Sequence, residues 1–276
     1  MPRLYISRNS PTYTPPTVRG AWESTGNIAR ALQSAPDVAN QGAVQVQSGY
    51  EVTTLTNYDV LLLRAVTAPL DANYTFGGTL NIMLPVQQSA SNSSNSYYLH
   101  VYVTTGNSDT VRGTLLANYF ESSTGDWSTT AAAKALLAAQ SLAAVAAQAG
   151  DRIVVEIGFR AKNGFSPQQF GYLYYGGYGA DIASGGAPGS GVGYIDFSDT
   201  FTLNETQTVR VTQVAAEVLR KQTNAAARVT QVAVEAIRRP SAPPARISQV
   251  AIEVIRKNAA PLPTTTLKPS LIVIAT

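Results

Sequence analysis

The residues that most often carry out catalysis or bind metals are scarce in this chain. It has 276 residues, no cysteine and one histidine, His100. A disulfide framework, a thiolate metal site and a cysteine nucleophile are therefore excluded, and a triad or a multi-histidine metal site built on one histidine is nearly impossible. We expect His100, which lies within the run YYLHVYVTT, to be a packed or surface imidazole.

Carboxylate and glycine motifs are also weak. Asp196 and Asp199 in YIDFSD resemble a carboxylate pair, but no base or nucleophile accompanies them. The loop 106–109 (GNSD) lacks the ordered ligand series of a calcium loop, and GGYG and GSGVG lack the Lys and Ser/Thr of a phosphate loop. The sequence therefore predicts no catalytic residue, no metal ligand, no cofactor and no enzymatic activity.

Aromatic side chains are the remaining candidates for binding. Rings in β-rich domains stack on sugars, although tyrosine is also common in the packing of any β domain. Both interpretations stay open for the aromatic residues near the glycine-rich region and for one tryptophan. The candidate glycan-stacking residues are Trp127, Tyr172, Tyr174, Tyr175 and Tyr178.

Strands must position these residues. Residues 1–206 carry short β-branched or aromatic runs separated by turn residues, which predicts a mainly β fold with a jelly-roll-like β-sandwich. Alternation within 97–105 is expected to bury one face and to leave the face with His100 and Tyr102 polar or aromatic. The expected strands are 59–67, 78–86, 97–105, 113–120, 151–160, 171–176 and 192–203.

Two segments of this body are ambiguous or irregular. The segment 131–149 is dense in alanine, which favours a helix over the edge of the sandwich, yet its second half runs into the strand 151–160 as a hairpin would. The segment 176–193 is rich in glycine and is expected to be a surface loop.

Charge divides the chain into a body and a tail. Residues 207–276 hold ten basic and three acidic residues, a net charge of +7, which leaves −4 for residues 1–206. Such asymmetry is typical of an interaction tail. Because the basic residues are dispersed and have no aromatic residues between them, we expect the tail to bind proteins in preference to nucleic acid.

The tail contains three copies of one motif. They occupy residues 210–221, 228–239 and 246–257, begin at Arg210, Arg228 and Arg246, and so repeat every 18 residues, with separators rich in small residues and proline. Helical spacing places the apolar residues of each copy on one stripe, which favours a short helix, while the β-branched content leaves open a strand added to a partner's sheet. The stripe residues, which we expect to dock on a partner, are Val211, Val214, Val218, Leu219, Val229, Val232, Ile237, Ile247, Val250, Val254 and Ile255.

A unit of this length is unstable alone in water, so it must dock on another surface. Three copies imply a symmetric or repeating partner, or neighbouring copies of the same protein; folding back on its own body is the alternative. A short strand is expected at 270–275 (SLIVIA). The chain opens without an apolar signal region and holds no run of about 18 apolar residues, so we expect no membrane partner.

Together these residues resemble the structural proteins of tailed-bacteriophage virions. The likeness rests on the phrases RGAWE (19–23), LHVYVTTGNSDTVRGTLL (99–116), AGDRIVVEIGFRA (149–161) and YLYYGG (172–177), and above all on the tail motif R-[VI]-[TS]-Q-V-A-x-E. It implies a non-enzymatic, oligomeric virion component made in the host cytoplasm, such as a capsid decoration or a neck, tail or fibre part, that contacts other virion proteins. The alternative is a module attached to the virion that recognises a glycan of the host surface.

Overall fold

The computed structural model describes residues 2–205 apart from 12, 14–15, 27, 38–42, 51–56, 122–124, 163–168 and 178, and the backbone of three strands beyond residue 205. The chain divides into two compact units, Met1–Glu205 and Thr206–Thr276, which we describe separately. In the described residues no helix is long and apolar enough to cross a membrane.

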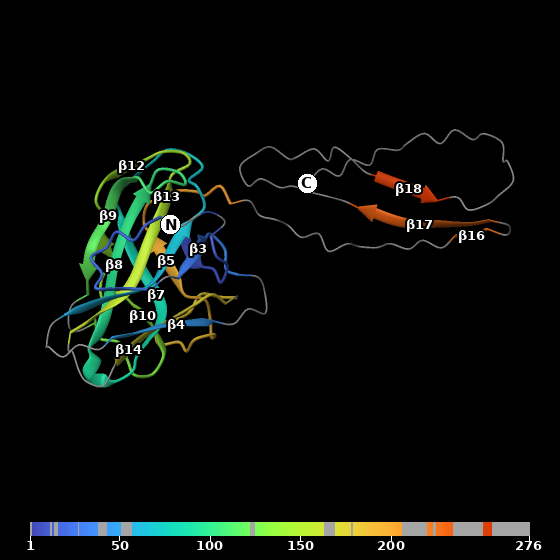
Figure 1. Ribbon diagram of the computed structural model, residues 1–276. Helices are drawn as coiled ribbons and strands as arrows, with labels where there is room; N and C mark the ends of the chain where they lie inside the picture. The colour runs from blue at the N-terminus through green and yellow to red at the C-terminus, as the bar shows by residue number, and fades with distance from the viewer. Residues whose placement is uncertain are drawn as a thin grey trace. The chain divides into compact units, whose positions relative to one another are not determined.

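The first unit is built from strands, and its described residues contain no α-helix (Figure 1). The mainly β prediction is therefore confirmed. The elements are β1 (Arg3–Ile6), β2 (Ser24–Thr25), β3 (Ala29–Gln33), β4 (Val44–Tyr50), β5 (Tyr58–Thr67), β6 (Tyr74–Phe76), β7 (Thr79–Gln88), the 3-10 turn η1 (Ser91–Ser93), β8 (Asn95–Thr104), β9 (Val111–Phe120), β10 (Ala132–Ala135), β11 (Gln140–Ser141), β12 (Val145–Ala147), β13 (Arg152–Ala161), β14 (Gln169–Tyr175) and β15 (Tyr194–Phe197).

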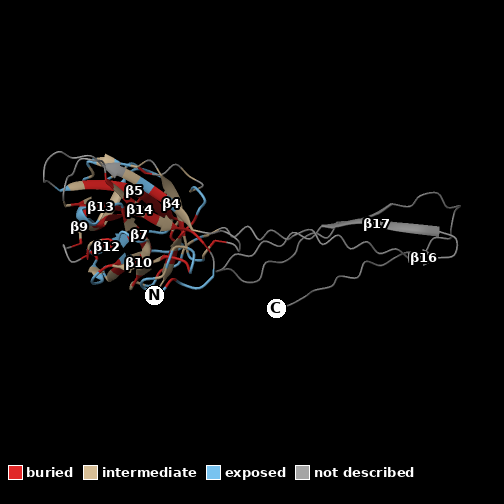
Figure 2. Cartoon of the chain, turned by 90° about the horizontal axis from the view of Figure 1, so that it is seen from below, coloured by how far each residue is buried: buried red, intermediate tan, exposed pale blue. Residues whose placement is uncertain are grey.

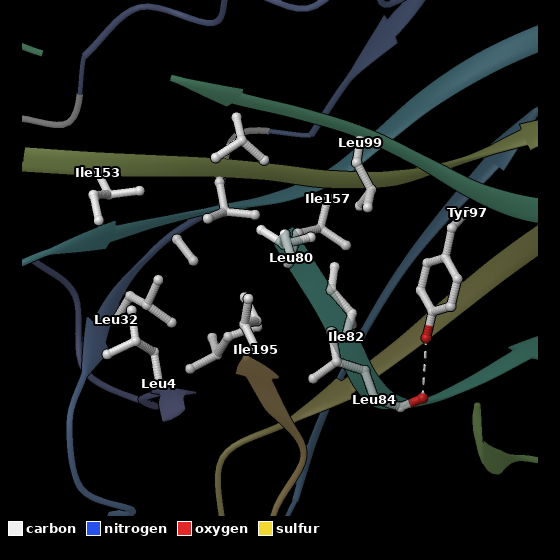
Figure 3. Close-up of a cluster of buried hydrophobic side chains, with 14 of the residues drawn as sticks. Leu4, Leu32, Leu80, Ile82, Leu84, Tyr97, Leu99, Ile153, Ile157 and Ile195 are labelled. Atoms are coloured by element: carbon white, nitrogen blue, oxygen red, sulfur yellow. Dashed lines mark hydrogen bonds between the residues drawn. The ribbon is translucent and has the colours of Figure 1, made fainter. Parts of the chain in front are cut away.

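One long sheet, with the order β4-β14-β7-β15-β1-β3-β5-β13-β8-β9, forms most of this unit. Strand β1 joins its two halves, because Arg3 and Leu4 pair with β15 whereas Tyr5 and Ile6 pair with β3. We call β4, β14, β7 and β15 the β7 section, and β3, β5, β13, β8 and β9 the β13 section. Buried side chains of both sections belong to one hydrophobic cluster (Figure 3), so the two sections face each other across a shared core. Val66, Tyr102 and Val154 form a second, smaller cluster.

Strand β13 lies at the centre of its section. It pairs along its length with β5 on one side and β8 on the other, and nearly all of β5 and β13 is buried (Figure 2). Tyr97 on β8 ties this section to β7, because its hydroxyl donates to the carbonyl oxygen of Leu84 at 3.1 Å (Figure 3). The core therefore includes a directional contact as well as apolar packing.

The alanine-dense segment 131–149 is not a helix. It forms β10 and β11, which pair with β7, and β12, which pairs with β6. The helical prediction is wrong, and so is the hairpin, since β12 does not pair with β13. Helix propensity amounts to only about 0.5 kcal/mol per residue, and strand pairing together with burial of Ala133 and Ala147 outweighs it.

Two further expectations for the body need correction. The strand expected at 192–203 is confined to β15. The segment 176–193, which was expected to be a loop, contains no named strand and needs no correction. The face of β8 that carries His100 and Tyr102 was expected to be polar or aromatic; it is so, but it is buried along its whole length. The covering segment comes from the N-terminus, as described below.

The second unit contains three described strands. They are β16 (Arg220–Gln222), β17 (Ala225–Ala233) and β18 (Ala251–Ile255). Strand β17 pairs antiparallel with β16 and β18. The backbone is thus extended in the described parts of the second and third repeats. The rest of the repeats and the expected strand 270–275 lie outside the described residues, so the conformation of a whole repeat stays a prediction.

Candidate functional site

The outer face of the β13 section is covered by residues 16–26, which we call the N-terminal strap. Its anchor is Glu156 on β13, whose side chain is completely buried. The carboxylate accepts hydrogen bonds from the backbone N–H of Arg19 at 2.7 Å and of Gly20 at 2.8 Å, and from the indole Nε1 of Trp22 at 2.7 Å. Donors from the strap thereby satisfy a charge that would otherwise be costly to bury.

Further polar groups on this face are engaged in the same way. The hydroxyl of Tyr102 donates to the carbonyl oxygen of Thr17 at 2.9 Å and shares this proton with Glu156 at 3.2 Å. Burial, followed by the negative charge of Glu156, raises the pKa of Tyr102. Arg64, opposite Glu156 in the strand register, donates to the carbonyl oxygen of Pro16. This buried network holds the strap in place.

His100 is a packed imidazole. It is 6% exposed, and its Nδ1 lies 3.0 Å from Oδ1 of Asn118, whose backbone N–H also approaches Nδ1 at 3.3 Å. Asn118 has a positive φ of 47°, where β9 loses regular register with β8. His100 thus connects β8 to the neighbouring strand β9.

The carboxylates Asp196 and Asp199 have separate partners. Asp196 accepts from Nε of Arg3 at 2.9 Å, whereas Asp199 accepts from the backbone N–H of Gly78 at 3.0 Å. Each carboxylate is thus engaged by a donor of its own from another part of the chain. Both carboxylates fix loops or strand ends.

The GNSD loop uses its oxygens for internal bonds. Asp109 accepts from the backbone N–H of Thr17 at 2.6 Å and from its hydroxyl at 2.5 Å, and Asn107 accepts from Nε of Arg152 at 2.8 Å. The hydrogen bonds from Thr17 lower the pKa of Asp109. Within the described residues, no group of three or more His, Asp or Glu side chains is placed to hold a metal ion.

The outer face of the β7 section is different, because it presents aromatic rings. Side chains of β14 alternate between buried and half-buried, so that Phe170, Tyr172 and Tyr174 share the outer side. In the strand register Tyr172 lies opposite Gln47 of β4 and opposite Gln87 of β7, and Tyr174 lies opposite Gln45. We call these six residues the tyrosine face.

Its rings have a defined arrangement. The ring centroids of Phe170 and Tyr172 are 6.3 Å apart with an interplanar angle of 29°. The hydroxyl of Tyr174 donates to Oε1 of Gln87 at 2.8 Å, and Nε2 of Gln87 donates to the carbonyl oxygen of Thr129 at 2.9 Å. Burial, followed by the neighbouring Tyr172, raises the pKa of Tyr174. The face thus combines an aromatic row with fixed amide groups.

The predicted stacking residues therefore divide into three groups. Tyr172 and Tyr174 lie on the tyrosine face, whereas Trp127 and Tyr175 are each 2% exposed and cannot stack on a ligand. Trp127 packs against Tyr97 and Phe159, and Tyr175 accepts a hydrogen bond from Arg30, so the prediction is wrong for these two. Tyr178 lies outside the described residues.

Phe170 and the three glutamines were missed by sequence reasoning. The signal for Phe170 was present, because in QFGYLYY the residues Phe170, Tyr172 and Tyr174 follow one another at intervals of two. A strand of that pattern directs these three rings to one side and Tyr175 to the other. The glutamines come from strands distant in sequence, and only the pairing places them beside the rings.

A shallow cavity of about 350 Å³ lies beside β10. It is bordered by Leu137, whose 53% exposure is the largest among the described large apolar side chains. The backbone N–H of Leu137 donates to Glu121 at 2.7 Å, but Oε2 of this fully buried carboxylate has no hydrogen-bond partner. Burial accordingly raises the pKa of Glu121. The ionised form of this carboxylate therefore destabilises the folded state.

The predicted docking stripe is described only in part. Val229 and Val232 lie in β17, and Val254 and Ile255 lie in β18, with Val229 paired to Val254. The side chains of these strands and the other stripe residues, Val211, Val214, Val218, Leu219, Ile237, Ile247 and Val250, lie outside what the structure describes.

Comparison with known proteins gives little information. No protein-family model and no curated protein matches the chain. Among solved structures, the chain is similar to an alpha-amino acid ester hydrolase labelled with selenomethionine, at 14% identity and a TM-score of 0.35. The match covers 72% of this chain and 36% of the hydrolase, so the chain spans about a third of that protein. A likeness of this size carries no argument about activity.

Proposed function

We propose that this chain is a non-enzymatic structural protein of a tailed-bacteriophage virion. Residues 1–206 form a jelly-roll-like body that is displayed on the particle, and residues 207–276 attach it. The observation that carries the proposal is the motif repeated every 18 residues, at 210–221, 228–239 and 246–257. It is supported by the resemblance of this motif to the tails of phage structural proteins.

The arrangement suits attachment to a repeating lattice. Each unit is too short to be stable alone, so its apolar stripe needs a complementary surface. Three units joined by separators rich in small residues and proline bind with avidity to several equivalent sites, which other virion proteins or neighbouring copies of this protein supply. A capsid decoration, a neck component, a tail component and a fibre component all fit this description.

The body fits a role in display. The buried carboxylate Glu156 binds the N-terminal strap, and Asp196, Asp199 and His100 each contact neighbouring strands or loops. These groups hold the fold together. The second candidate function, a glycan-recognition module attached to the virion, is favoured by one observation, the half-buried aromatic row of the tyrosine face.

The test compares particle occupancy of full-length variants. Val232→Asp places a charge on the stripe of the second unit and should abolish docking of that unit, which lowers occupancy several-fold through lost avidity. The triple variant Val214→Asp, Val232→Asp and Val250→Asp should be absent from purified particles. Gln231→Glu adds the same charge on the opposite face of the helical pattern and should leave occupancy unchanged. Normal occupancy of the triple variant would show that the tail does not attach the protein.

A further inference from the structure

We infer that the tyrosine face of the β7 section binds a neutral oligosaccharide. The site is formed by the aromatic row Phe170, Tyr172 and Tyr174 and by the flanking amides of Gln45, Gln47 and Gln87. This inference goes beyond attachment to a particle, since it concerns what the displayed body recognises.

The first support is the ring arrangement. Alternate residues of a strand lie about 6.6 Å apart, so the three side chains form a regular row along β14. Phe170 and Tyr172 are inclined by only 29° at a centroid distance of 6.3 Å, a stacked pair whose planes are nearly parallel. A row of near-parallel rings offers apolar surface to the C–H groups of successive sugar rings in a chain.

The second support is the polar border of the row. Gln45 and Gln47 are exposed on β4, next to Tyr174 and Tyr172 in the register. Each amide carries both donors and an acceptor, which is the combination that pairs with a sugar hydroxyl acting as acceptor and donor. Gln87 is held by Tyr174 and by the carbonyl oxygen of Thr129, so the border is partly fixed before a ligand arrives.

The third support is the charge of the face. None of its six residues is charged, although the body carries a net charge of −4. An anionic or cationic ligand would meet no complementary charge on these six residues, whereas a neutral polyhydroxyl ligand requires only rings and amides. The chemistry therefore selects neutral saccharides over phosphate, uronic acid or basic peptide.

The contrast with the opposite face strengthens the argument. On the β13 section the aromatic Tyr98 and Tyr102 are covered, Tyr98 by the ring of Trp22 from the strap at a centroid distance of 4.9 Å. On the β7 section Tyr172 and Tyr174 stay half-buried and reachable. The large side chains of this face thus remain available where those of the other are enclosed.

The experiment uses the full-length protein on an array of neutral gluco-, galacto- and manno-oligosaccharides, with sialylated and uronic acid oligosaccharides printed beside them. We expect binding to a neutral oligosaccharide. Against the best such ligand, Tyr172→Ala and Phe170→Ala should each weaken affinity about tenfold, and Gln47→Ala, an exposed position that cannot unfold the sheet, should weaken it about threefold. Tyr172→Phe keeps the ring and should stay within about threefold of the wild type.

Tyr119→Ala is the matched control, because Tyr119 is a half-buried tyrosine on β9, at the far edge of the other section. It should bind as the wild type does. The inference is overturned if the wild type binds no neutral oligosaccharide, if it binds only the anionic ones, or if Phe170→Ala, Tyr172→Ala and Gln47→Ala all bind as the wild type does. Because occupancy on particles is not measured here, failure of this site leaves the attachment proposal standing, and the reverse is also true.

Discussion

Replacement of Glu156 by glutamine should release the N-terminal strap. The four hydrogen bonds of this carboxylate divide evenly between its oxygens. Oε1 accepts from the N–H of Arg19 and from the hydroxyl of Tyr102, and Oε2 accepts from the N–H of Gly20 and from the indole of Trp22. Glutamine keeps one oxygen and turns the other into an amide donor. If the amide faces Gly20 and Trp22, both of these donors lose their acceptor; if it faces Arg19, that N–H loses its acceptor while the hydroxyl of Tyr102 keeps the carbonyl oxygen of Thr17 at 2.9 Å.

The size of the effect follows from this division. A hydrogen bond to a charged group contributes about 1.5–3 kcal/mol net, and at least one is lost. The strap can turn its freed N–H group toward water, so the lower end applies to that bond, and the remaining bonds to a neutral amide oxygen are weaker, so Glu156→Gln should cost about 2 kcal/mol. Glu23→Gln is the control in the same strap. Its exposed carboxylate accepts one backbone N–H, from Asp59 at 2.6 Å, and its loss should cost less than about 1 kcal/mol.

Urea unfolding measures the free energy, and tryptic cleavage measures the strap itself. Arg19 is exposed within the strap, and local release should raise the rate of cleavage after it before the whole unit unfolds. Mass spectrometry of the fragments identifies this cut. If Glu156→Gln unfolds within about 1 kcal/mol of the wild type and Arg19 is cut no faster, then the strap is held by other contacts and the reasoning fails.

Two further substitutions test the core. Burial raises the pKa of Glu121 above its ordinary 4.5, so the protonated carboxyl favours the folded state below that value, and this contribution is lost as the pH rises through the raised pKa. Glu121→Gln should therefore be about 1 kcal/mol more stable than the wild type near pH 8, and the difference should vanish near pH 4. Equal stability in urea at both pH values would contradict this. At Gly158 an added Cβ would lie 1.9 Å from the carbonyl oxygen of Val60, so Gly158→Ala should cost about 3 kcal/mol or prevent folding, whereas Gly77→Ala, whose nearest neighbour is 3.9 Å away, should unfold within about 1 kcal/mol of the wild type.

The long central strands were predictable because their local side-chain pattern is typical of buried strands. Strands β5, β7, β8, β9 and β13 are continuous or alternating runs of β-branched, leucine and aromatic residues bounded by turns, and each lies within a few residues of its predicted range. Strands β1 and β3 were missed, since RLYI and ARALQ are short and mix charge with apolar residues. Their place is set by pairing with β15 and β5, which no local pattern encodes.

The alanine-dense segment shows the limit of propensity. Its small side chains suit a helix in isolation, but they also fit the pairing of Ala132–Ala135 with β7. Close packing against β9 depends on the glycine of that strand, because an added Cβ on Gly113 would lie 2.8 Å from Val145 of this segment. Alanine fits a crowded sheet edge for the same reason that it fits a helix, and the tertiary contacts decide between them.

The sequence predicted that aromatic residues form the candidate site, but it did not predict which residues lie together. Periodicity distinguishes Tyr174 from Tyr175 once β14 is known to be a strand, but it cannot tell whether an outer face is covered. That depends on what crosses it: residues 16–26 cross the β13 section and supply N–H groups to Glu156, which is 137 positions from Arg19. The buried charge of Glu156 and the N-terminal strap depend on each other, because the strap supplies the donors that the carboxylate needs. The tyrosine face carries rings and amides without a buried charge, so it needs no such cover. A face of this kind keeps its apolar area within reach of a ligand without leaving an unsatisfied charge behind. For that reason we propose recognition for the β7 section, whereas the contacts of Glu156 give the β13 section a structural role.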